Sequence, residues 1–316
     1  MFRNDPSEKI SHREKESVGY SGISQSSLHA PYLFIAPSFI LLAIFFVIPV
    51  VAAFLMSFTD FDIYSLAHFR FARFVGLGNY MNLFSDPLFW KSMFNTFYFL
   101  ILGGPLTILV ALVAAVFLNS KLVKFKSLLR LGFFAPVVAT LVAVSVVWKY
   151  IYDPRFGLLN YALSFFGVSP RDWLSDPVWA MPAIIFFAVW KNFGYTMMIF
   201  LAGLQTIPDV LYEAAGIDGA GPWQRFWKIT IPMLAPTTLF VTVVTLIGYL
   251  QLFAEPYIMT GGGPMNSTLS IVLLMYRQGF RYWQMGYAAS LAFVLAAVIF
   301  IFTMIQMRVQ GEGKAA

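Results

Sequence analysis

Two long apolar stretches of the sequence carry polar side chains well inside them. Residues 178–204 and 233–256 together contain Lys191, Asn192, Tyr195, Thr196, Tyr249, Gln251 and Glu255. A polar group surrounded by lipid costs several kcal/mol unless it faces protein or water. These side chains therefore line a path for a polar solute or bind one another. In the second case the hydroxyls and amides join helices by hydrogen bonds, and Lys191 and Glu255 form an ion pair or reach toward the membrane surface.

The sequence offers little for covalent or metal chemistry. It has no cysteine, and its three histidines, His12, His29 and His68, are far apart. The apolar stretches contain no histidine and no pair of carboxylates that could act as acid and base. The glycine run that ends at Pro264 is followed by Met265 and Asn266, so no phosphate-binding loop with its lysine is present. We therefore expect a non-catalytic chain with no metal site and no ATPase activity of its own.

The composition is that of a membrane protein. Of 316 residues, 59% are hydrophobic and only 11% are charged, whereas charged residues make up about 25% of an ordinary soluble domain. Backbone polar groups in hydrocarbon must be paired within a helix or a closed barrel, and long continuous apolar runs favour helices. An all-α fold of six transmembrane helices is predicted, at about residues 33–57, 94–118, 129–152, 178–204, 233–256 and 285–308.

The basic residues predict the orientation. Twelve of them lie in the polar residues 1–30, in the second and fourth connections and after the last stretch, whereas seven are spread over the other three connections. The positive-inside rule then places both termini in the cytoplasm. The net charge of +6 forms no stripe along a helix, so nucleic acid is not an expected partner.

A structured polar loop separates the fourth and fifth stretches. It includes the sequence EAAGIDGAGPWQRFWKITIPML, from Glu213 to Leu234. Thr206, Pro208 and Asp209 predict the start of a helix that ends at Gly219 and Gly221. Pro222 then opens a second helix with Trp223, Phe226, Trp227 and Thr230 on one face, and Pro232 is expected to end it. The unit is either a connector at the membrane surface or a plug for another protein.

This loop resembles the EAA motif of permease subunits in bacterial binding-protein-dependent ABC importers. The matching residues are Glu213-Ala214-Ala215, Gly219, and Ile231-Pro232, and the longer string is similar to the carbohydrate-uptake branch of the maltose and lactose permeases. Four further stretches agree in order and spacing: FVGLGNY (74–80), DPRFGLLN (153–160), WLSDP (173–177) and YIMTGGGP (257–264). The chain departs from the family at Gly216, where arginine is common.

The resemblance implies a type I importer permease fold in the bacterial cytoplasmic (inner) membrane. Residues 1–30 would form a cytoplasmic tail and residues 31–316 the permease domain, with its core at about 92–308 and a coupling loop at 206–232. The residues that would dock on an ATPase subunit are Glu213, Ala214, Ala215, Asp218, Gly219 and Ala220. The implied partners are a second permease in a heterodimer, two ATP-binding cassette subunits that hold ATP and Mg, and a soluble extracytoplasmic binding protein.

The resemblance also points to a sugar as the transported solute. Amide groups and aromatic faces suit sugar hydroxyls and C–H surfaces, so the polar residues named first would serve in its path. A glycerol phosphate or polyol permease fits the same framework. An ion-coupled secondary transporter, from another class, would require carboxylates at mid-membrane, where the spans offer only Glu255, near one end.

Overall fold

The computed structural model describes residues 30–67, 72–120 and 122–312, and they form helices and connecting turns with no strand among them. The predicted tail lies outside these residues except for Ala30. Four helical segments are long and apolar enough to cross a membrane: Tyr32–Met56, Pro87–Asn119, Ala180–Gln205 and Met285–Arg308. Two bent helix pairs pass the same test together, which makes six spans if each pair counts as one. The all-α membrane fold is confirmed.

The chain divides into two compact units between Ala52 and Ala53. The first unit, as far as it is described, is one helical run: α1 (Ala30–Leu42), a π-helical turn (Ala43–Val47) and the start of α2 (Ile48–Met56). Large apolar side chains such as Phe34, Phe45 and Phe46 are exposed around it. A helix that is apolar on all sides is typical of a lipid-facing span.

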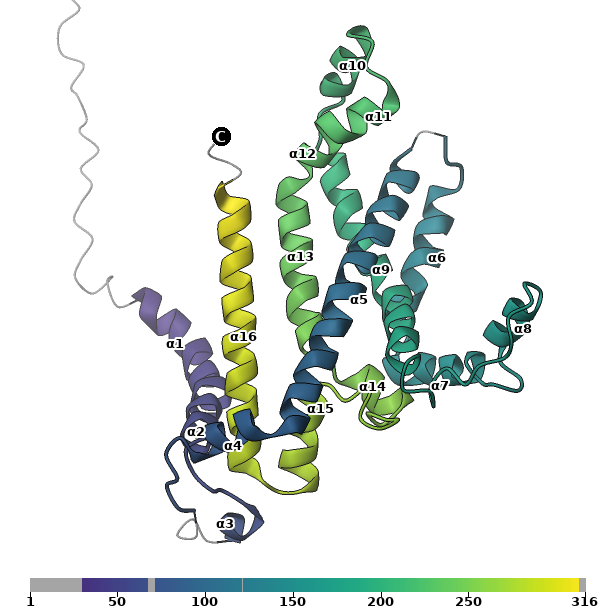
Figure 1. Ribbon diagram of the computed structural model, residues 1–316. Helices are drawn as coiled ribbons and strands as arrows, with labels where there is room; N and C mark the ends of the chain where they lie inside the picture. Colours follow the sequence, from purple (N-terminus) through teal and green to yellow (C-terminus); the bar gives the residue numbers. More distant parts are fainter. Residues whose placement is uncertain (1–29, 68–71, 121, 313–316) are drawn as a thin grey trace, which may run out of the picture. The chain divides into compact units, whose positions relative to one another are not determined.

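The second unit begins at Ala53 and is built around two long helices, α5 (Pro87–Asn119) and α9 (Ala180–Gln205), which pack along each other. The other spanning elements are α6 (Lys126–Val138), α7 (Leu141–Ile151), α13 (Ala235–Leu250) and α16 (Met285–Glu312). Shorter helices lie at the two ends of this bundle (Figure 1). One end has α10 (Asp209–Ile217), α11 (Pro222–Arg225) and α12 (Ile231–Met233); the opposite end has α3 (Ile63–Ala67), α4 (Gly78–Ser85), α8 (Leu158–Ser164), α14 (Ala254–Met259) and α15 (Ile271–Tyr276).

Small residues allow the central helices to approach closely. Ala111 and Ala115 of α5 are fully buried against α9, and a Cβ added to Gly103 would lie 3.0 Å from the ring of Tyr249 on α13. A Cβ at Gly194 of α9 would lie 2.1 Å from the carbonyl oxygen of Phe133 on α6. Lipid tails are as apolar as the side chains, so close backbone approach of this kind is a main source of attraction between helices in a membrane.

Two of the predicted spans are not single straight helices. The third breaks after Val138, and α6 and α7 meet at 98°. Ala139 and Thr140 between them have extended backbones, and Pro136 supplies no N–H to the last turn of α6. The fifth ends at Leu250, and Gln251–Phe253 separate it from α14. The prediction that Tyr249, Gln251 and Glu255 share one helix is therefore wrong.

The connection between α14 and α15 is fixed by hydrogen bonds from neighbouring elements. Asn95 of α5 donates to the carbonyl oxygens of Asn266 (2.8 Å) and Leu269 (2.9 Å). Ser270, at the end of the connection, donates to the carbonyl of Leu252 in the break before α14, and Arg277 donates to the carbonyl of Gly261. Gly261 and Gly262 have φ of +62° and +88°, which glycine adopts without steric cost. The sequence YIMTGGGP thus ends α14 and begins an ordered loop beside the helix break.

The contact between Gly194 and Phe133 yields a first prediction. Gly194→Ala forces α6 and α9 apart and should lower the stability of the folded protein by roughly 1–3 kcal/mol, the usual cost of overpacking. Gly132→Ala is the matched control: it lies on α6 next to Phe133, and an added Cβ there meets nothing within 4 Å. Thermal unfolding of the purified protein in detergent measures both variants. Equal midpoints for the two would show that the close contact is absent.

Candidate functional site: a cavity at two helix breaks and a protruding loop

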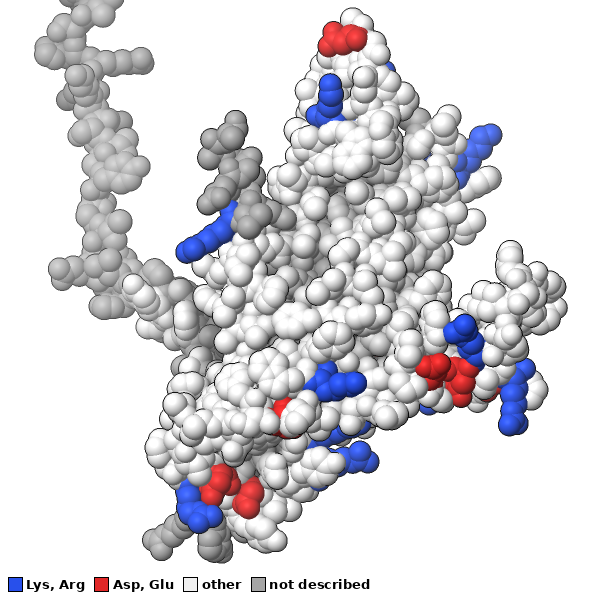
Figure 2. Space-filling view, in the orientation of Figure 1, with Lys and Arg blue, Asp and Glu red and all other residues white. Residues whose placement is uncertain are grey.

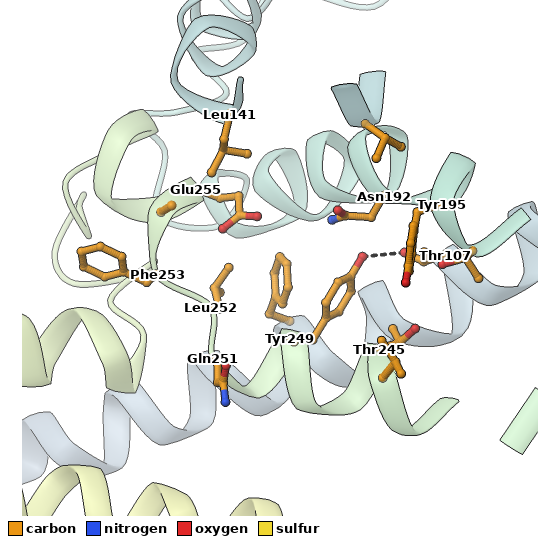
Figure 3. Close-up of a pocket in the computed structure, with 16 residues that line it drawn as sticks. Thr107, Leu141, Asn192, Tyr195, Thr245, Tyr249, Gln251, Leu252, Phe253 and Glu255 are labelled. Atoms are coloured by element: carbon orange, nitrogen blue, oxygen red, sulfur yellow. Dashed lines mark hydrogen bonds between the residues drawn. The ribbon is translucent and has the colours of Figure 1, made fainter. Parts of the chain in front are cut away.

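A cavity of about 450 Å³ lies between α5, the α6–α7 bend, α9 and the break after α13. Six of the seven predicted path residues line it (Figure 3), namely Asn192, Tyr195, Thr196, Tyr249, Gln251 and Glu255. The first three come from α9, Tyr249 lies in the last turn of α13, Gln251 lies in the break, and Glu255 belongs to α14. Residues far apart in sequence are therefore brought together, and the cavity presents amide, hydroxyl and carboxyl groups beside aromatic rings.

The two helix breaks are what form this cavity. Val137 and Leu141 lie on either side of the α6–α7 bend, and Gln251, Leu252 and Phe253 form the other break; all five line the cavity. Non-helical backbone at membrane depth is tolerated only where it is buried in protein or faces a water-filled space. The arrangement therefore suits a polar solute that passes between the helices.

Tyr249 is held in a fixed position at the cavity wall. Its hydroxyl lies 2.6 Å from that of Thr107 on α5 (Figure 3), its ring lies 4.8 Å from the ring of Phe99, and the edge of the ring packs on Gly103. Only one of the two hydroxyls donates in their shared bond, so the other keeps a proton for a further acceptor. Tyr195, by contrast, is 49% exposed. One tyrosine is thus fixed in place, whereas the other offers an open ring face.

Thr107 is a lining residue that the sequence analysis missed. It follows Gly103-Gly104-Pro105, which marks an irregular point in a predicted span. Threonine is common in membrane helices, where its hydroxyl bonds to its own helix. Only its pairing with Tyr249, 142 residues away, distinguishes it.

Lys191 has a different environment from the other six residues. Its side chain is 8% exposed, and its ammonium group donates to the carbonyl oxygens of Pro136 (2.6 Å) and Val137 (3.0 Å). These carbonyls belong to the last turn of α6, where the bend removes the helical donors. A cation is also favoured there by the helix dipole. Lys191 thus caps α6 across the helix interface, a role that the sequence analysis did not consider, and it is not among the residues that line the cavity.

The predicted coupling loop protrudes from one end of the bundle (Figure 1). None of the described residues of α10 is buried, and Ile217 is 89% exposed. Gly219 has a φ of +76°. The amides of Gly219 and Ala220 donate to the carbonyls of Gly216 and Ala215, which is the Schellman arrangement that ends a helix. The predicted end of the helix at Gly219 is confirmed.

Two other local predictions for this loop are wrong. Thr206 does not cap α10, because its amide and hydroxyl both bond back to Gly203 and so complete α9. The extended Pro208 precedes α10, which begins at Asp209. Pro232 does not end the second helix either: the chain stays helical through Met233, and it bends by 64° at Leu234. The proline lies in the first turn of α12, where it costs no hydrogen bond.

Side-chain contacts fix the two helices of the loop to each other. Arg225 of α11 donates from Nε to the carbonyl of Ala220 (2.8 Å), and its guanidinium lies 3.3 Å from where a Cβ of Gly216 would stand. The hydroxyls of Tyr212 and Thr230 lie 2.9 Å apart. An arginine therefore covers the position at which the sequence departs from the EAA pattern, although it comes from nine residues further along. The loop forms a preorganised knob.

The fold and these sites agree with one protein family. The family described as binding-protein-dependent transport system inner membrane component matches residues 75–310. The chain belongs to this family, and it is therefore an inner-membrane permease component of a binding-protein-dependent transport system.

Several permeases are similar to this chain in sequence. The chain is 37% identical over 301 residues to the lactose transport system permease protein LacF of Rhizobium radiobacter, covering 92% of this chain and 99% of the relative. It is 34% identical to the arabinooligosaccharides transport system permease protein AraP of Bacillus subtilis, covering 94% and 93%. It is also 34% identical to the trehalose/maltose transport system permease protein MalF of Thermococcus litoralis, covering 88% and 92%.

Solved structures support the fold. A chain of a bacterial alginate ABC transporter, crystallised with an alginate pentasaccharide-bound periplasmic protein, superposes with a TM-score of 0.74. It covers 88% of this chain and 92% of the other at 23% identity. The predicted importer permease fold is confirmed.

The capping role of Lys191 yields a second prediction. Lys191→Met removes the donor for two buried carbonyls and should destabilise the protein by about 1–3 kcal/mol. Lys149→Met, at an exposed lysine in the last turn of α7, is the control and should leave the unfolding temperature nearly unchanged. Thermal unfolding in detergent separates the two roles of Lys191. Unchanged stability together with impaired solute transport would instead make Lys191 a ligand-binding group.

Proposed function

We propose that this chain is the transmembrane subunit of an ATP-driven importer that forms half of the path for a neutral sugar. The observation that carries the proposal is the cavity at the two helix breaks, with Asn192, Tyr195, Tyr249 and Gln251 in its wall. Asparagine and glutamine side chains both donate and accept hydrogen bonds, as sugar hydroxyls require. Tyrosine rings pack on the apolar faces of the sugar. The relatives named for lactose, arabinooligosaccharides and trehalose or maltose support the same class.

The charges at the cavity favour a neutral solute over a phosphate ester. Neither lysine nor arginine is among the described residues that line the cavity, and its one carboxyl group is that of Glu255. The nearby cation, Lys191, uses two of its three N–H groups on the α6 carbonyls. An anionic solute would meet no free cation among the described residues in this part of the path, whereas hydroxyl groups find several partners.

The proposed assembly has two different permease subunits, two ATP-binding cassette subunits and a soluble binding protein that delivers the sugar. ATP and Mg would bind to the cassette subunits, and this chain would act without catalysis or cofactor of its own. The end with α10 and α11 would face the cytoplasm, as would both termini. The C-terminal end of α16 lies at that same end of the unit (Figure 1), in agreement with this orientation.

In this proposal the knob formed by α10 and the Gly219 turn docks in a cleft of one cassette subunit. Glu213, Ala214, Asp218 and Gly219 are exposed, and Ala215 and Ala220 are partly so. Small side chains permit close approach of a partner's backbone, and Ile217 offers an apolar contact at the tip. The family supports the location, and the preorganised geometry of the loop supports a rigid contact.

Purification in mild detergent tests the assembly and its substrate together. A tagged chain, purified from the membranes of the cells that encode it, should retain a second permease and an ATPase. Proteoliposomes of this complex, supplied with binding protein and ATP, should accumulate labelled lactose, maltose, trehalose or an arabinooligosaccharide. Uptake that proceeds without ATP and follows an ion gradient would instead identify a secondary transporter, and uptake of glycerol phosphate but no sugar would overturn the substrate class.

The Gly219 turn yields a further prediction about coupling. Gly219→Ala places a Cβ at a φ of +76°, which costs about 1–2 kcal/mol for an L-residue. The turn should then relax and α10 should lose its docked position, so that sugar uptake per ATP falls severalfold while the chain still inserts in the membrane. Gly221→Ala is the control, because Gly221 has a φ of −69° and equally open space. Equal uptake-to-ATP ratios for the two variants would contradict docking through this turn.

A further inference from the structure

A short segment between α7 and α9 has a surface that the transport function leaves unexplained. It contains α8 (Leu158–Ser164) and the turn after it, and its exposed large apolar side chains are Phe156, Leu158, Tyr161, Phe165 and Phe166. Phe166 is 84% exposed. So dense an apolar surface on so few residues marks an interaction site, since soluble surfaces rarely carry one.

The segment is held rigidly from its base. Asn160, in the middle of α8, is buried, and its amide donates to the carbonyls of Arg171 (2.8 Å) and Asp153 (3.3 Å). Its oxygen accepts from the indole of Trp173 (2.9 Å) and the amide of Arg171 (3.2 Å). These residues lie in or beside the stretches DPRFGLLN and WLSDP. The residues bonded to Asn160, which we call the frame, thus hold the exposed apolar residues of α8 and the Phe165-Phe166 turn, which we call the tip.

The charged residues of this segment are confined to the base. The carboxyl group of Asp153 accepts hydrogen bonds from the backbone amides of Phe156 and Arg155. These bonds hold the pKa of the carboxyl below its usual value, so the group is ionised at neutral pH. The guanidinium of Arg171 lies 4.8 Å from the ring centre of Trp179. Figure 2 shows red and blue side chains gathered near the end of α7, whereas the projecting tip beside them is white.

The tip is also level with part of a spanning helix. Figure 1 shows the chain turning back from the end of α7, so that α8 projects in the direction of α6 and its tip is level with the lower part of that helix. The exposed Val142, Val146 and Tyr150 of α7 continue the apolar surface toward it. From base to tip, charges and tryptophans are followed by phenylalanine and leucine, the order in which a membrane presents headgroups and hydrocarbon.

We propose that α8 and the following Phe165-Phe166 turn form an anchor that inserts into the lipid leaflet at the α14 end of the bundle. Its occupant is acyl chain rather than another protein, because the polarity changes from the charged base to the apolar tip, as it does from headgroups to hydrocarbon, and not across one face of the segment. The frame around Asn160 connects the lipid contact to the C-terminal end of α7, through Asp153. The anchor thereby restrains α7, whose other end forms the bend beside the transport cavity.

Spin labels can test this directly, because the chain has no cysteine. Phe166→Cys and Tyr161→Cys place labels on the tip, and Ser175→Cys places one on the polar base as the matched control. The complete transporter is reconstituted in vesicles of phosphatidylethanolamine and phosphatidylglycerol. Collision rates of each nitroxide with oxygen, which concentrates in lipid, and with a water-soluble nickel chelate are then measured.

Labels at 161 and 166 should show an oxygen-to-nickel collision ratio severalfold above that of the label at 175. A tip label that collides freely with the nickel chelate would place α8 in water and overturn the anchor. An immobilised tip label that is shielded from both reagents would show a protein contact instead, and it would overturn the anchor as well. Since neither outcome depends on the sugar, the anchor and the proposed function can fail independently.

Discussion

The carbonyl groups at the end of α6 set a constraint on which the rest of the structure depends. A helix that stops inside the membrane leaves its last carbonyls without donors, and hydrocarbon offers none. Lys191 satisfies two of them from the neighbouring helix. The 98° bend can therefore persist at depth, and the wall of the cavity can be made of broken helices. Without such a donor the chain would favour a continuous third span and a filled interior.

Close packing supplies the second half of the same arrangement. Gly194 lies one turn after Lys191 on α9, and its missing side chain allows the backbone of α6 to approach. The ammonium can reach the end of α6 only because the helices are so near. Gly103 has a comparable relation to Tyr249, whose hydroxyl then meets Thr107. In both places a glycine allows two helices to approach closely, and polar groups one turn away can then form a hydrogen bond between the helices. Packing and hydrogen bonding are therefore coupled.

Much of the fold could be predicted from the sequence, because segments that cross the hydrocarbon must be long and apolar and can be recognised by their hydropathy. The Gly219 turn was equally predictable, since only the local backbone decides it. The bend after Val138 could not be predicted, because a proline in a membrane helix is often tolerated without a bend. The bend depends on Lys191, which lies 55 residues beyond Pro136. The break at Gln251–Phe253 is fixed by Ser270 and other groups of a distant loop. Such long-range partners leave no periodic signal, so Glu255 was assigned to the wrong helix and Thr107 was missed.

The path between the coupling loop and the cavity follows from connectivity. α9 carries Asn192, Tyr195 and Thr196 into the cavity wall and ends at Gln205, and the three residues 206–208 connect it to α10. α13 begins after the bend at Leu234, and its last turn holds Tyr249 at the same cavity. At about 1.5 Å per residue, the 26 residues of α9 span about 39 Å without a break. If a cassette subunit moves the knob, both helices attached to it must move, and they are the ones that hold the polar side chains of the cavity. One break follows the far end of α13, and the other, the α6–α7 bend, is bonded to the middle of α9 through Lys191, so a displacement of the loop changes the shape of the cavity.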